Sequence, residues 1–113
     1  MFTVSFQRNC LSALAEEGIL AAQVGDISFE TNLVLGVFKR LREVFPIVRA
    51  YLAPIPSYSV LPYSFAYCSN TILPEKGLGL ARFGNGFDTR YYNPRIHHAA
   101  FALPEYLQTR FEN

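Results

Sequence analysis

The densest group of side chains that could do chemistry lies near the C-terminus, in the stretch "RYYNPRIHHAAFALPEYL" from Arg90 to Leu107. Its adjacent histidines, His97 and His98, suggest a metal site. Neighbouring helical residues point about 100° apart, whereas ligand pairs favour spacings such as i and i+4, which put both on one face. No nearby cysteine or carboxylate completes a ligand set. We therefore predict one packed and one exposed histidine, and no metal site.

Acidic and nucleophilic side chains form no pattern that assigns a reaction. The scattered carboxylates are Asp26, Glu30, Asp88 and Glu105. Spacing alone pairs none of them as acid and base. Ser57 and Ser59 lie in a loop that lacks the G-x-S-x-G turn of a nucleophile elbow.

Aromatic residues are the more informative class, with 7 tyrosines and 10 phenylalanines. Tyr58 lies in "IPSYSVLP", a loop bracketed by prolines at a predicted strand end. Such loops line ligand clefts in open α/β sheets, and a tyrosine ring can contact an amine or sulfonium cation. From the residues alone, a packing or turn role for Tyr58 is an equal alternative.

The first element that positions these residues is a helix over residues 3–16. Thr3 or Ser5 can cap it, and Gly18 can end it in a left-handed conformation. Its apolar stripe is predicted to contain Phe6, Cys10 and Leu14.

The following pattern alternates between strands and a helix. "ILAAQV" (Ile19–Val24) predicts a strand buried on both faces, and a helix of roughly residues 29–45 ends before Pro46. "IVRAYLAP" and "YSFAYCS" predict two more strands, joined by the proline-containing loop. The inner stripe of the second helix is predicted to be Leu33, Val37, Leu41 and Val44. This order predicts an α/β fold with a mixed three-stranded sheet and helices, similar to the C-terminal half of a Rossmann-like, methyltransferase-type fold.

Composition restricts the function classes. The 113 residues make one domain at most, 50% are hydrophobic and only 17% are charged, against about a quarter in soluble domains. This predicts surface that another chain or domain covers, with a compact apolar monomer as the alternative. A net charge of +1 without a basic run argues against nucleic-acid binding, and no apolar run reaches about 18 residues, as a membrane span requires. The absence of a signal-peptide pattern, with the unpaired spacing of Cys10 and Cys68, predicts reduced cysteines in a cytoplasmic protein.

Three motifs, in order and spanning nearly the whole chain, resemble the C-terminal part of the polyamine aminopropyltransferases, the spermidine synthases. "EEGILAAQVG" is similar to that family's helix–strand–corner, and "IPSY" to its P-S/T-Y loop. "RYYNPRIHHAAFALPEYL" is similar to its closing signature, a YYN step, a spaced histidine and AAF-x-LP.

The resemblance implies a reaction. Family members transfer an aminopropyl group from decarboxylated S-adenosylmethionine, a co-substrate, to putrescine, giving spermidine and 5′-methylthioadenosine; no metal or bound cofactor is implied. The resemblance assigns Gln23 and Tyr58 to the amine-binding pocket. It also makes the closing signature mainly a structural cap, anchored by Phe101 and Leu103, so no catalytic residue is assigned.

Other family motifs have no counterpart in the sequence. The Gly-rich "GGGDGG"-like donor loop, the acidic residue ending the second strand and the catalytic Asp of "D-S/C-x-DP" do not occur, and "SVLPYSF" stands where glycines are usual. The resemblance therefore implies that residues 1–113 are the C-terminal part of a catalytic domain, without its donor-binding half. We expect this chain to be inactive alone, and to bind the missing half, another subunit or itself. The alternative is a non-catalytic interaction or dimerisation remnant of the family.

Overall fold

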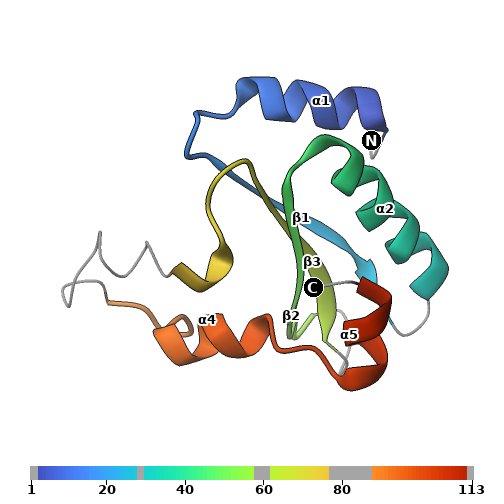
Figure 1. The fold of residues 1–113 in the computed structure, drawn as a ribbon. Coiled ribbons are helices and arrows are strands. Elements are labelled where there is room, and N and C mark those ends of the chain that lie inside the picture. The colour runs from blue at the N-terminus through green and yellow to red at the C-terminus, as the bar shows by residue number, and fades with distance from the viewer. Residues whose placement is uncertain (1–2, 28–29, 58–61, 77–87, 112–113) are drawn as a thin grey trace.

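The structure, a computed structural model, describes residues 3–27, 30–57, 62–76 and 88–111. Three strands form one sheet, with helices packed around it (Figure 1). The elements are α1 (Val4–Ala13), β1 (Ile19–Asp26), α2 (Thr31–Val44), β2 (Ile47–Ala53), β3 (Tyr63–Ser69), the 3-10 turn η1 (Pro74–Lys76), α4 (Pro94–Ala100) and α5 (Glu105–Phe111). The predicted α/β class and all three predicted strands are confirmed. Within the described ranges, no helix combines the length and the apolar character needed to cross a bilayer.

The sheet has the order β1-β3-β2, and both pairings are antiparallel. The predicted mixed sheet is wrong in this detail. Because β1 and β2 are each antiparallel to β3, they run parallel to one another, as the crossover through α2 requires. They are not neighbours, however, since β3 lies between them (Figure 1).

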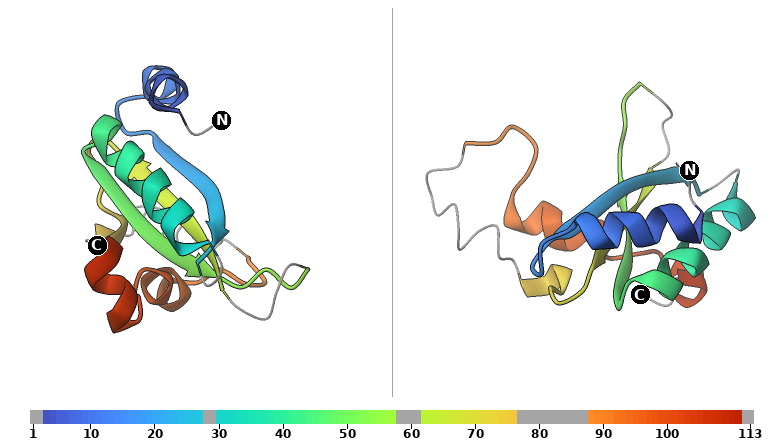
Figure 2. Two further views of the ribbon diagram at one scale, coloured as in Figure 1. Left: turned by 90° about the vertical axis from the view of Figure 1, so that its right-hand side faces the viewer. Right: turned by 90° about the horizontal axis from the view of Figure 1, so that it is seen from above.

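Helix α2 supplies the centre of the core, and it covers one face of the sheet (Figure 2). The predicted stripe is wrong for Leu33, whose side chain is 62% exposed. The buried positions follow the helical i, i+3, i+4, i+7 spacing, with Val34 in place of Leu33 and with Phe38 added. They are Val34, Val37, Phe38 and Leu41.

Helix α1 begins as predicted but faces the core differently. The Thr3 hydroxyl accepts a hydrogen bond from the backbone N–H of Phe6 at 3.2 Å. Phe6 itself is 46% exposed, whereas Gln7 is 1% exposed, so the predicted stripe is wrong at Phe6, while Leu14 packs partly against the core as predicted. The helix ends at Ala13, and Gly18 is not left-handed. A Cβ at Gly18 would lie 2.9 Å from the carbonyl oxygen of Ala15, so close approach is what favours glycine there.

The C-terminal helices fasten onto opposite sides of this core. Directly after α4, the Phe101 ring lies 5.1 Å from that of Tyr51 and 5.8 Å from that of Tyr67, on the sheet face that α2 does not cover. In α5, Phe111 is fully buried with its ring 4.9 Å from that of Phe38, and the Arg42 guanidinium donates to its carbonyl oxygen. These contacts agree with a structural cap.

Candidate functional site

Gln23 lies on β1 near the end of the sheet at which the C-termini of β1 and β2 are located. Asp26 and Ala53, the last residues of these strands, are both opposite Tyr63, the first residue of β3. The loop that follows β2 therefore starts at the same end of the sheet as the C-terminus of β1. Tyr58, the other predicted amine-binding residue, follows in that loop and lies outside the described residues.

The odd-numbered residues of β1 from Ile19 to Gln23 form an exposed face, which corrects the prediction of a strand buried on both sides. Ile19, Ala21 and Gln23 are exposed, while Leu20 and Val24 pack partly against the core. The Gln23 amide is therefore open to a ligand. Gln23 lines neither the cavity of about 350 Å³ beside β2 nor that of about 200 Å³ under α4.

Aromatic rings continue the sheet face on which Gln23 lies. Gln23 is opposite Phe65, whose ring stacks on Tyr51 at 5.2 Å and meets Tyr63 edge-on at 6.1 Å. Burial raises the pKa of Tyr51 above its ordinary value, so this phenol stays neutral. An amide beside neutral aromatic rings suits an amine, which can both donate hydrogen bonds and pack its alkyl chain.

Asp26 and Glu30, which spacing alone leaves scattered, are linked through the backbone at the end of β1. The backbone N–H of Glu30 donates to the Asp26 carbonyl oxygen at 3.0 Å. The Glu30 Oε2 lies 3.4 Å from where a Cβ on Gly25 would stand. The signal available in the sequence was their position directly after a strand, where open α/β sheets bind ligands.

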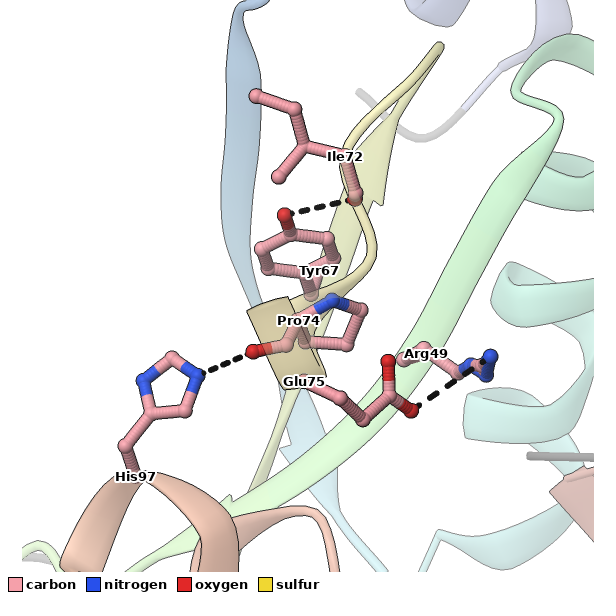
Figure 3. Close-up of polar contacts among 6 residues, drawn as sticks. All are labelled: Arg49, Tyr67, Ile72, Pro74, Glu75 and His97. Carbon is pink, nitrogen blue, oxygen red and sulfur yellow. Dashed lines mark hydrogen bonds and ion pairs between the residues drawn. The ribbon is translucent and has the colours of Figure 1, made fainter. Parts of the chain in front are cut away.

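His97 joins α4 to η1 through a side-chain hydrogen bond, in agreement with the prediction of one packed histidine (Figure 3). Its Nε2 donates to the Pro74 carbonyl oxygen at 2.7 Å, since a carbonyl can only accept. Its Nδ1 then accepts from the Tyr92 hydroxyl at 2.9 Å. His98 is exposed. Within the described ranges, no group of three His, Cys, Asp or Glu residues is arranged to hold a metal.

The polar contacts around η1 also hold structure in place (Figure 3). The Tyr67 hydroxyl donates to the Ile72 carbonyl oxygen at 2.9 Å, and Arg49 pairs with Glu75 at 3.6 Å. Burial, and secondarily the Glu75 carboxylate, raise the pKa of Tyr67. These groups are engaged with each other and with backbone, so we assign them no chemistry.

Cys68 is not a nucleophile. Its side chain is fully buried in the core. Burial raises the pKa of its thiol to about 12, although the Arg42 charge opposes the shift. Since the thiolate is the reactive species, Cys68 is inert at neutral pH. Cys10 is also unpaired, and it is partly exposed.

Comparison with known proteins gives one consistent result. The family model described as "Spermine/spermidine synthase domain" matches residues 1–76. A polyamine aminopropyltransferase of Desulforudis audaxviator is 36% identical over 98% of this chain and 40% of its own length. That of Alkaliphilus metalliredigens is 34% identical over 100% of this chain and 41% of its own length.

Solved structures agree with this result. The spermidine synthase of Thermotoga maritima superposes with a TM-score of 0.85 at 30% identity, covering 98% of this chain and 38% of that one. A spermidine synthase in complex with the transition-state analogue AdoDATO gives 0.86 at 30% identity, covering 98% and 39%. The chain thus spans about 40% of the length of the relatives it matches.

Proposed function

Since the chain belongs to the spermine/spermidine synthase family, we propose that it forms the amine-binding side of a polyamine aminopropyltransferase. The reaction transfers an aminopropyl group from decarboxylated S-adenosylmethionine to putrescine, and yields spermidine and 5′-methylthioadenosine. The donor is a co-substrate, and the proposed reaction uses no metal or bound cofactor. We also propose that the protein is cytoplasmic.

The chemistry requires a neutral, oriented amine. Its nitrogen forms a bond to the carbon next to the sulfonium, the C–S bond breaks, and the thioether leaves with the bonding electrons. An alkylammonium has a pKa near 10, so a proton must be removed before attack. In our proposal the Gln23 amide oxygen accepts a hydrogen bond from the amine and aims its lone pair, and Tyr58 lines the same pocket. The exposure of Gln23 beside the Phe65 and Tyr51 rings supports this role.

We propose that the donor-binding residues and the catalytic base lie outside residues 1–113. The sequence contains neither the Gly-rich donor loop nor the Asp segment that its family resemblance leads one to expect. We propose that a donor-binding half or another subunit supplies both, and that the chain also associates with itself.

The family match carries the proposal, and the exposure of Gln23 at the strand end supports it. The test is an aminopropyl-transfer assay on the purified chain, with and without the donor-binding part of the Thermotoga maritima enzyme. We expect no 5′-methylthioadenosine from either part alone and product from the two together. Binding between the parts without product would instead support the non-catalytic interaction role.

A further inference from the structure

Strand β1 contains a bulge immediately after Gln23. Gln23 is opposite Phe65 and Gly25 is opposite Ser64, so two steps along β1 match one step along β3. Val24 is the extra residue. Bulges of this kind bend a strand and change the direction of the side chains that follow, and they are frequent beside active sites.

The bulge brings Asp26 to the face of the sheet on which Gln23 lies. Residues three apart in a regular strand point to opposite faces. Here Gln23 is opposite Phe65 and Asp26 is opposite Tyr63. Because Tyr63 and Phe65 are two apart on β3, with their rings in contact at 6.1 Å, they share a face. Gln23 and Asp26 therefore share it too, which places an amide and a carboxylate on one face at the strand end.

Ser64 holds the bulge in place. Its side chain is 0% exposed, and its hydroxyl donates to the Gly25 carbonyl oxygen at 2.6 Å. Gly25 is also packed closely: an added Cβ would lie 3.0 Å from the Val34 side chain. The strand thus has a fixed partner on β3 and a close neighbour on α2 at this point.

We propose that Asp26 is a second polar contact for the amine substrate, and that Ser64 is the positioning residue that makes it one. The proposal rests on the proposed aminopropyl transfer. A diamine that reacts at one end must present that nitrogen as the neutral amine, while the other end stays an ammonium. The Gln23 amide suits the neutral end and the Asp26 carboxylate suits the charged end, through a charge-assisted hydrogen bond.

The fold provides a matched control at the other end of β3. Ser69 is also 0% exposed, and its hydroxyl donates to the Gly18 carbonyl oxygen at 3.1 Å. This bond joins β3 to the chain just before β1 begins, far along the strand from the bulge. Ser69→Ala therefore removes a serine–carbonyl bond of the same kind, together with the bonds that this hydroxyl accepts from the Thr71 and Ile72 N–H groups, without touching Gly25.

The positioning role is tested on the chain itself by amide NMR, independently of activity. We expect Ser64→Ala to shift the backbone resonances of Gly25 and Asp26 and the side-chain amide of Gln23, and Ser69→Ala to leave them in place. Unchanged Asp26 and Gln23 resonances in folded Ser64→Ala would overturn the positioning role. Equal shifts in both variants would do the same.

The contact role is tested by kinetics in a fusion of this chain to the donor-binding part of the Thermotoga maritima enzyme. We expect Asp26→Asn to raise the KM for putrescine about tenfold, with an unchanged KM for the donor. Ser64→Ala should raise the same KM in part, and Ser69→Ala should not. An unchanged putrescine KM in Asp26→Asn, beside a raised one in Gln23→Ala, overturns the contact.

A fusion without transfer activity would contradict the proposed function and not, by itself, the amine site. In that case putrescine is titrated directly into the fusion by calorimetry. Binding that Asp26→Asn weakens about tenfold supports the contact, whereas equal binding, or none, in both proteins overturns it.

Discussion

The Cys68 thiol links a single buried group to the pH dependence of stability. Its pKa in the folded chain is about 12, against an ordinary value of 9.0. Between these values the unfolded chain loses this proton and the folded chain keeps it. The folded state therefore binds more protons, and stability falls as the pH rises. The contribution is fully present below pH 9 and is lost toward pH 12.

We expect the free energy of unfolding to fall by on the order of 1 kcal/mol per pH unit above pH 9 through this one group. Urea unfolding at pH 8, 9, 10 and 11 measures the slope. Cys68→Ala should be clearly less steep between pH 9 and 10, with a remaining slope at higher pH from Tyr51 and Tyr67, whose pKa values are also raised. Identical slopes for both proteins would contradict the assignment.

His97 and His98 offer a contrast between neighbouring residues. His97→Ala removes the ring nitrogens that bond to the Tyr92 hydroxyl and to the Pro74 carbonyl oxygen, and should cost about 1–2 kcal/mol. His98→Ala removes an exposed side chain and should change stability by less than about 0.5 kcal/mol. Urea unfolding of both variants measures these changes. Equal losses of stability would argue against a structural role for the His97 hydrogen bonds.

Sequence motifs led to the proposal that Gln23 binds the amine, and its exposure on β1 is compatible with that proposal. Asp26 and Ser64 could not be predicted in the same way. Asp26 shares a face with Gln23 only because the pairing of β1 with β3 shifts by one residue. The paired residues are far apart in the sequence: Gly25 and Ser64, for example, are separated by 39 positions. No local pattern encodes such a shift, whereas helix and strand periodicity is local.

At the scale of elements, the same distinction explains which details of the fold were predicted. The three strands and α2 follow from periodicity and from Pro46. The predicted stripe of α2 was wrong at its first position, because Leu33 and Val34 both fit a helical spacing with Val37 and Leu41. The observed buried face of α2 includes Phe38, whose large ring packs on Phe111 from α5. Helical spacing alone does not reveal this tertiary contact. Strand order was likewise a nonlocal property.

The packing of α1 gives an element-scale prediction. Gln7 is 1% exposed, and neither amide atom has a hydrogen-bond partner within the described structure. An unpaired buried amide costs about 1–3 kcal/mol. Gln7→Met, which keeps the length of the side chain and removes the amide, should therefore raise the free energy of unfolding by about 1–2 kcal/mol.

The control for this substitution is Gln23→Met, at an exposed position, which should give no such gain. Chemical denaturation of the three proteins provides the comparison. A loss of stability in Gln7→Met would mean that its amide makes a favourable interaction in solution.

At the scale of the whole molecule, β1 is an edge strand of the described sheet, because its pairing partner is β3 and the order is β1-β3-β2. Such an edge can pair with another chain. Ile19–Val24 contains no proline or charge that would hinder pairing, and Ile19 is 46% exposed. The low charged fraction, 17%, gives little opposing repulsion.

We therefore expect the purified chain to self-associate through β1 at micromolar concentration, as measured by light scattering. Ala21→Lys places a charge on the exposed face of β1 and should shift the mass toward the monomer, since edge lysines oppose strand pairing. Asn32→Lys adds the same charge at an exposed position of α2 and should leave the association unchanged. A monomer mass for the unaltered chain, together with slow amide exchange along Ile19–Val24, would show that this edge is already covered within one molecule. Adding the donor-binding part of a relative should in turn compete with self-association if both use β1.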